Sequence, residues 1–98
     1  MAHYRISALA RRHLKEIAEY TIEAYGENQA EAYLAGFESI FKLITSFPQM
    51  GAVAFELKHG LRRHKYQKHH VYYCSDVDGV LIEAVFHVAV NMRPELFE

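Results

Sequence analysis

The chain has 98 residues, of which 51% are hydrophobic and 23% are charged, and its formal net charge is −1. This length predicts one domain over residues 1–98, and the composition is globular rather than disordered. Proteins that bind the phosphate backbone of nucleic acids usually carry a much more positive net charge, so we expect no direct sequence-specific nucleic acid binding. No run reaches the ~18 apolar residues of a membrane span and the start lacks an apolar signal core, which predicts a cytoplasmic protein with no membrane partner.

The first quarter of the chain predicts a short strand followed by a helix. Residues His3 to Ser7 alternate between polar and apolar side chains, as a strand with one buried face does. Ser7 is expected to cap the helix that follows, because its hydroxyl can accept a hydrogen bond from an unpaired amide. From Ala8 to Tyr25 apolar residues recur every three or four positions, and Gly26 is well placed to end this helix.

A second helix is predicted between Asn28, as its cap, and Pro48, before which helical geometry is disfavoured. It carries the strongest periodic apolar pattern in the chain. The members of that pattern are Ala30, Tyr33, Leu34, Phe37, Ile40, Phe41 and Ile44. Two amphipathic helices joined at Gly26 predict an antiparallel hairpin with a shared apolar side.

The second half predicts a loop over residues 49–60 and then three strands. The strand candidates are Leu61 to Gln67, His69 to Ser75 and Val80 to Val88, with a hairpin turn at Asp78-Gly79. Alternation in the last candidate predicts that one side of the sheet carries Val80, Ile82, Ala84, Phe86 and Val88. The order β-α-α-β-β-β predicts an α+β domain, in which an antiparallel sheet packs against an N-terminal helical hairpin.

Acidic and basic residues are separated along the chain. Between Glu16 and Ile40 there are six acids and no Lys or Arg, whereas between Leu57 and His70 there are five Lys or Arg, four His and no acid. Two interpretations stay open. Both tracts can be ordinary solvated faces of folded elements, or the basic tract can be a docking surface for an acidic partner.

The reactive side chains form no pattern typical of catalysis or metal binding. Adjacent His69 and His70 would point to opposite faces of a strand, the single Cys74 has no partner thiol, and no glycine-rich phosphate loop is present. We therefore expect no metal and no cofactor, and a buried structural role for Cys74. Of Tyr72 and Tyr73, one ring must face away from the other, so one is a candidate for an exposed stacking surface.

Six segments, taken in order, resemble the ParE toxins of the ParE/RelE superfamily, the toxic halves of bacterial type II toxin–antitoxin pairs. They include a small polar cap before a helix with Ala, Leu, Ile and Tyr at helical spacing, an aromatic-Gly-x-x-Gln-Ala junction and an x-Pro-x-x-Gly turn. The segments are Ser7–Thr21, Tyr25–Ala30, Phe47–Gly51, Gly60–Arg63, His70–Tyr73 and Phe86–His87. The resemblance covers about residues 4 to 96 and implies the RelE/ParE-like fold.

The resemblance also implies a toxin neutralised by a ParD-like antitoxin encoded beside it. ParE-type members trap DNA gyrase with cleaved DNA, whereas RelE-type members cut messenger RNA in the ribosomal A site. We expect the gyrase-directed, non-enzymatic branch, because no Tyr follows Tyr73 and His87 is followed by apolar residues. The alternative is a ribonuclease in which His87 moves a proton and Arg62, Arg63 and Lys65 stabilise the phosphate charge.

Candidate contact residues follow from the favoured branch. The candidates for target binding are Arg62, Arg63, Lys65 and Arg93. Leu9, Ile22 and Leu43 are predicted to fall outside the internal apolar stripes and to contact the antitoxin, although closing the core is an equal alternative. Ala89-Val90-Asn91 stand where the family usually has x-Arg/Ser-Met-Asp, so a member that binds an antitoxin but has lost toxicity is a third alternative.

Overall fold

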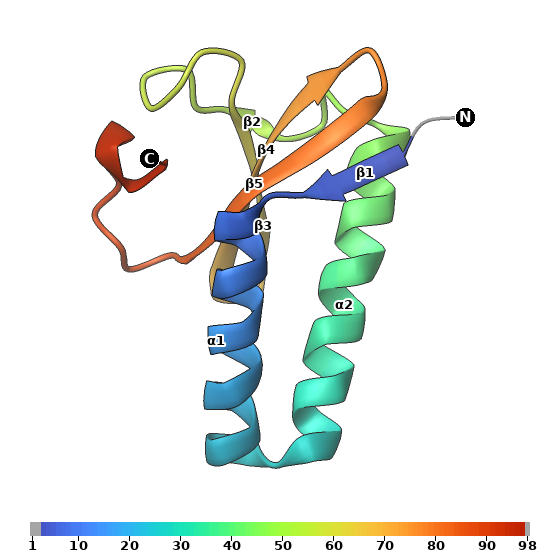
Figure 1. Cartoon of the computed structure of the whole chain (residues 1–98), viewed down its shortest axis with the longest axis vertical. Helices are drawn as coiled ribbons and strands as arrows, with labels where there is room; N and C mark the ends of the chain where they lie inside the picture. The colour runs from blue at the N-terminus through green and yellow to red at the C-terminus, as the bar shows by residue number, and fades with distance from the viewer. Residues whose placement is uncertain (1–2, 98) are drawn as a thin grey trace.

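The computed structural model describes residues 3–97. The elements in chain order are β1 (His3–Ile6), α1 (Ala8–Tyr25), α2 (Glu27–Ser46), β2 (Ala52–Val53), β3 (Arg62–Tyr66), β4 (His69–Asp76), β5 (Gly79–His87) and a 3₁₀ turn, η1 (Pro94–Phe97). In Figure 1 the two helices stand side by side and join at the lower end, and the C-terminal tail leaves β5 on the side away from α2. The predicted α+β class is confirmed, and the predicted elements occur in the predicted order, with one additional short strand, β2. No helix within residues 3–97 is both long and apolar enough to cross a membrane.

The sheet has five strands in the order β1-β5-β4-β3-β2, and it is mixed. Strand β1 pairs in parallel with β5, and the remaining neighbours pair antiparallel. This corrects the expectation of a wholly antiparallel sheet. The region predicted as a loop also contributes the two-residue edge strand β2. Gly79 marks the place where β1 joins, because a Cβ there would overlap the carbonyl oxygen of His3.

Helix α1 has the predicted bounds, but the junction to α2 differs from the prediction. Gly26, at φ 91°, is the only residue between the two helices, so it ends α1 and also occupies the N-cap of α2. The prediction that Asn28 caps α2 is wrong, because the helix already begins at Glu27. The other end is confirmed, since α2 stops at Ser46, before Pro48.

The main core lies between the helical hairpin and one face of the sheet. Its buried members are Ala10, Phe37, Phe41, Ile44, Val71, Tyr73, Val80, Ile82 and Val85. Gly36 lets β3 approach α2 closely, because a Cβ at this position would overlap the ring of Tyr66. The Tyr66 hydroxyl donates to the carbonyl oxygen of Tyr33 at 3.2 Å, and its ring meets Phe37 edge-on at 4.7 Å. The lower half of the sheet is therefore fixed to α2 by aromatic packing.

A second, smaller core covers the opposite face of the sheet. It contains Ala54, Leu61, Tyr72 and Ala84, with Leu57, Cys74, Phe86, Met92 and Phe97 packed against it. The tail thus folds back over this face, and the Phe97 ring lies 5.3 Å from the Tyr72 ring. The prediction of an exposed tyrosine is wrong, because Tyr72 and Tyr73 are both 0% exposed. The two rings point to opposite faces of the sheet, and both faces are covered, by the helices over Tyr73 and by the loop before β3 and the tail over Tyr72.

A β-bulge in β5 changes which side chains share a face. Tyr72 pairs with Ala84 whereas Tyr73 pairs with Ile82, so Glu83 is an extra residue in the register. Ile82 lies in the main core but Ala84 lies in the second. The alternation predicted for β5 is therefore wrong beyond Ile82, since one inserted residue moves every later side chain to the other face.

Candidate functional site

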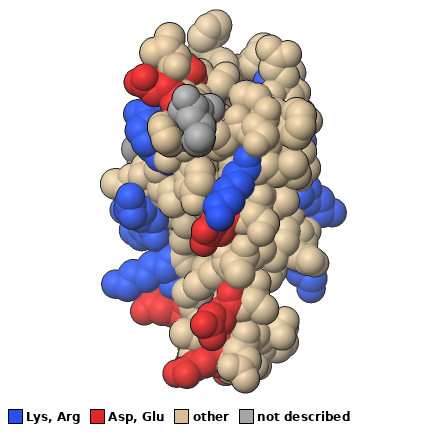
Figure 2. Space-filling model, turned by 90° about the vertical axis from the view of Figure 1, so that its right-hand side faces the viewer, with Lys and Arg blue, Asp and Glu red and all other residues tan. Residues whose placement is uncertain are grey.

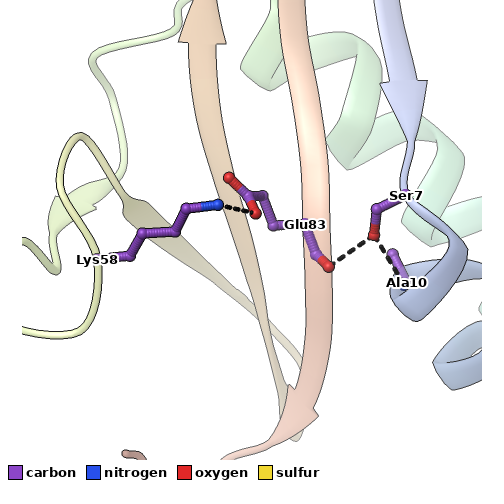
Figure 3. Close-up of polar contacts among 4 residues, drawn as sticks. All are labelled: Ser7, Ala10, Lys58 and Glu83. Atoms are coloured by element: carbon purple, nitrogen blue, oxygen red, sulfur yellow. Dashed lines mark hydrogen bonds and ion pairs between the residues drawn. The ribbon is translucent and has the colours of Figure 1, made fainter. Parts of the chain in front are cut away.

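The bulge is held by polar contacts from two other parts of the chain, the start of α1 and the loop before β3, shown in Figure 3. The Ser7 hydroxyl donates to the carbonyl oxygen of Glu83 at 2.7 Å and accepts from the amide of Ala10 at 3.0 Å. The predicted helix cap is therefore confirmed, and the same hydroxyl also ties α1 to β5. On the other side of the strand, Lys58 Nζ donates to Glu83 Oε1 at 2.6 Å. These contacts fix β5 between the helices and the loop before β3.

Cys74 lies beside this carboxylate and is not set up as a nucleophile. Burial, followed by the hydrogen bond and charge of Glu83, raises the pKa of the Cys74 thiol to about 12. A reactive cysteine needs the opposite, a thiolate stabilised by a neighbouring cation. The thiol packs against the second core, as a structural cysteine does.

Two of the predicted target-binding cations share one face of the sheet. Side chains alternate along β3 between the two faces of the sheet. Tyr66 packs on α2, so Lys65 and Arg63, one and three positions before it, point away from the helices. His70 pairs with Lys65 across the ladder, and the pKa of His70 is lowered by burial and then by the charges of Arg63 and Lys65. Neither cation forms an ion pair with any residue in the range 3–97. We call Arg63, Lys65 and His70 the cationic face.

The other two predicted cations occupy different positions. Arg62 lies on the helix side of β3 and donates from Nη1 to the carbonyl oxygens of Gly51, at 2.9 Å, and Gln49, at 3.3 Å. It therefore holds the loop that follows α2. Arg93 is exposed in the tail, next to Met92, which packs on the second core. The tail thus carries Arg93 on the same side of the sheet as the cationic face.

His87 lies on the helix side of the sheet, in a pocket of about 550 Å³ lined by α1, α2, the β3–β4 turn and the facing strand ends at His69 and His87. Its ring meets the His69 ring edge-on at 5.4 Å, and its Nδ1 accepts from the amide of Ala89 at 3.0 Å. His69 Nδ1 shares a 2.7 Å hydrogen bond with the Tyr33 hydroxyl. Burial and then the charge of His87 lower the pKa of His69 to about 4, so its imidazole is neutral at pH 7.

The sheet separates His87 from Arg63 and Lys65, two of the three cations predicted for the ribonuclease alternative, and the third, Arg62, donates to the carbonyl oxygens of Gly51 and Gln49. His87 shares a rung with His69 and Tyr66, whereas Lys65 shares the next rung with His70. Successive rungs point to opposite faces, so the sheet separates His87 from Lys65 and Arg63. Lys68, in the turn between β3 and β4, is the cation that lines the pocket of His87.

The three predicted antitoxin contacts differ in exposure. Ile22 on α1 is 45% exposed and Leu43 on α2 is 40% exposed, and both lie outside the main core, as predicted. Leu43 borders a second pocket, of about 810 Å³, beside the exposed Phe47 and Met50. Leu9 instead packs against the second core, so the alternative of closing the core applies to it.

Sequence reasoning missed the pocket around His69 and Tyr33, because its residues are far apart in the chain. Periodicity placed Tyr33 in the core stripe of α2, and no local signal indicated that its hydroxyl would meet a histidine 36 residues later. The hairpin register alone sets His69 opposite His87. Within residues 3–97 no group of three or more His, Cys, Asp or Glu is arranged to hold a metal ion.

The matched family model and the curated relatives named below are all ParE toxins. The family model described as "ParE toxin of type II toxin-antitoxin system, parDE" matches residues 4–92. The chain is 31% identical to Toxin ParE1 of Caulobacter vibrioides, over 98% of this chain and 99% of that toxin. It is 28% identical to Toxin ParE1 of Mycobacterium tuberculosis, over 97% and 98% of the two chains.

The fold is also found among solved structures. A chain of the chromosomal ParDE system from P. aeruginosa superposes with a TM-score of 0.74, covering 89% of this chain and 96% of that one, at 13% identity. At that identity the likeness supports the architecture alone, including the mixed sheet and the helical hairpin. The family match over nearly the whole described length carries the identification. The chain is a member of the ParE toxin family of type II toxin–antitoxin systems.

Proposed function

We propose that this toxin inhibits DNA gyrase by binding it, without breaking bonds itself, and that a ParD-like antitoxin encoded beside it neutralises the toxin. The observation that carries the proposal is the cationic face, where Arg63 and Lys65 have no ion-pair partner among residues 3–97. Unpaired cations on a rigid sheet are suited to an acidic partner such as the gyrase–DNA complex. Arg93 extends this surface along the tail, and Arg62 supports it by holding the neighbouring loop.

The separation of His87 from Arg63 and Lys65 supports the non-enzymatic branch. A ribonuclease needs its proton donor or acceptor and its phosphate-stabilising cations to meet at one phosphodiester. Here the sheet stands between His87 and Arg63 or Lys65. Burial holds the pKa of His69 near 4, which also makes this imidazole a weak base.

A supercoiling assay with purified gyrase tests the proposal. Wild-type toxin is expected to inhibit supercoiling and to cause linear DNA to accumulate. An Arg63→Ala/Lys65→Ala variant is expected to require about tenfold more protein for the same inhibition, since two charged contacts are lost. Lys42→Ala is the matched control, because Lys42 is exposed on α2 and paired with Glu38.

Three results would contradict the proposal. The first is normal supercoiling with no linear DNA at an excess of folded protein. The second is cutting of messenger RNA in a translation extract that disappears in His87→Ala, which would assign the ribonuclease function instead. Normal growth when the chain is overexpressed without an antitoxin would indicate that toxicity has been lost.

Neutralisation is proposed to use exposed apolar side chains of the hairpin, including Ile22 and Leu43. Amphipathic segments commonly bind in this way, with apolar anchors entering a groove and the polar edge left in water. Hydrogen exchange of the toxin with and without its antitoxin locates the contact. Protection is expected along α1 and α2, and protection confined to the second core around Leu9 would contradict this site.

A further inference from the structure

The pocket beside His87 has an unusual aromatic lining that the proposed gyrase contact does not use. Helix α1 contributes Glu16, Tyr20 and Tyr25, helix α2 contributes Tyr33, and the strand ends contribute His69 and His87. We call it the tyrosine pocket. Its volume, about 550 Å³, lies in the range of sites that enclose a small ligand or a large side chain.

The rim of the tyrosine pocket is exposed although its floor is fixed. Tyr20 is 65% exposed and Tyr25 is 68% exposed, which is high for such large rings. Tyr33 below them is held by its hydrogen bond to His69 and by its edge-on contact with Phe37, at 5.2 Å. Exposed tyrosines around a preformed hollow are typical of the residues that dominate binding interfaces.

The charges around the pocket favour a cationic occupant. Glu16 lines it and forms no ion pair with any described residue from His3 to Phe97. Four further acids lie on the last two turns of α1 or the first turns of α2, near the junction at Gly26: Glu19, Glu23, Glu27 and Glu31. Figure 2 shows acidic side chains gathered toward the lower end of the molecule, where α1 and α2 join. A phosphate-bearing ligand would be repelled by this field.

The neutral groups of the pocket suit a planar cation. Tyrosine faces attract a guanidinium through their ring quadrupole, and the Glu16 carboxylate can accept two parallel hydrogen bonds from it. The His69 imidazole does not oppose a cation, because its lowered pKa keeps it neutral at pH 7. Lys68 lines the side formed by the β3–β4 turn, so a bound cation is expected nearer α1.

We propose that the tyrosine pocket receives an arginine side chain of the antitoxin segment that neutralises this toxin. The inference rests on the proposed function for the identity of the partner. The guanidinium stacks on Tyr20 or Tyr25 and pairs with Glu16. It anchors the antitoxin at the hairpin end, apart from the cationic face on the opposite side of the sheet.

A titration with small probes tests the pocket without any antitoxin. N-acetyl-arginine amide is added to isotope-labelled toxin, and amide shifts are followed by NMR. Saturable shifts are expected at Tyr20, Tyr33 and His69, and the neutral isostere N-acetyl-citrulline amide should give none. Equal shifts from both compounds, or the same shifts from guanosine monophosphate, would overturn the assignment of a cation.

Removing a charge from the pocket should change the affinity for a cation and the affinity for a phosphate in opposite directions. Glu16→Gln should weaken binding of the arginine probe about tenfold, as expected when a charged hydrogen bond is lost. Lys68→Met should strengthen binding of the same probe. Glu38→Gln is the control, because Glu38 is exposed and paired with Lys42 outside the pocket. The reverse signs would overturn the proposal.

Binding of the neighbouring gene's antitoxin is measured with the same variants and with Tyr20→Ala. A loss of about tenfold or more in Glu16→Gln and Tyr20→Ala, with Glu38→Gln unchanged, is the expected result. Wild-type affinity in both pocket variants would overturn the inference and leave the toxin–antitoxin pairing intact. Failure of the antitoxin to bind even the wild-type chain would overturn the proposed partner, while the probe titration still reports on the pocket.

Discussion

Replacing Ser7 with alanine removes one hydroxyl group and, with it, two hydrogen bonds. The Ser7 hydroxyl accepts from the amide of Ala10 and donates to the carbonyl oxygen of Glu83, at 3.0 Å and 2.7 Å. Ala10 is fully buried, so water cannot replace the lost acceptor. The helix cap is worth about 1 kcal/mol, and the hydrogen bond to Glu83 adds about 1 kcal/mol. Ser7→Ala should therefore lower the free energy of unfolding by about 2 kcal/mol.

Urea unfolding followed by circular dichroism measures this change, with the midpoint shifted and the slope retained. The melting temperature should fall by about 8–16 °C for a domain of this size. Ser39→Ala is the matched control, since the Ser39 hydroxyl donates to the Ala35 carbonyl oxygen on an exposed helix surface. It should change stability by no more than about 0.5 kcal/mol. If Ser7→Ala behaved like this control, the account of Ser7 as the joint between α1 and β5 would be refuted.

Three other predictions concern packing and charge. Gly36→Ala should destabilise the fold by about 1–3 kcal/mol, because the new Cβ overlaps the Tyr66 ring. Thermal unfolding measures this change, and an unchanged melting temperature would contradict the close contact between α2 and Tyr66. Lys58→Met should lower the free energy of unfolding by about 1–3 kcal/mol, because the Glu83 carboxylate, whose side chain is only 10% exposed, loses its cation. In a double-mutant cycle, adding Glu83→Gln should recover part of this lost stability. The folded pKa of His69, about 4, lies below its ordinary 6.5, so the unfolded chain binds the extra proton between these values. The free energy of unfolding should thus fall by about 1–2 kcal/mol through this partly exposed group as pH drops from 6.5 to 4, and His69→Gln should show a correspondingly smaller fall.

Local signals predicted the helices, the strands and most of their ends. The bounds of α1 followed from its apolar spacing, the Ser7 cap and Gly26, all of which act within a few residues of the chain. The end of α2 before Pro48 has the same kind of cause. The cap at Asn28 was predicted wrongly, because the one-residue junction at Gly26 left no room for a separate cap.

Contacts between distant segments decided what the sequence left open. The parallel pairing of β1 with β5 and the packing of the tail over Tyr72 depend on residues more than 20 positions apart. The bulge at Glu83 is held by Ser7 and Lys58, which also lie more than 20 positions from it in the chain. The bulge in particular reversed the facing of Ala84 and Phe86, which no alternation pattern could reveal.

The sequence by itself determined the fold class, the helical hairpin and the cations of β3, because these depend on periodicity and on residue type. Only the tertiary structure decided which face of the sheet Arg63 and Lys65 occupy, that Arg62 turns to the helix side and that His87 meets His69 and Tyr33 in a pocket. The physical reason is register: a side chain's face and neighbours are set by which residues pair across the sheet, and pairing is a property of the folded chain.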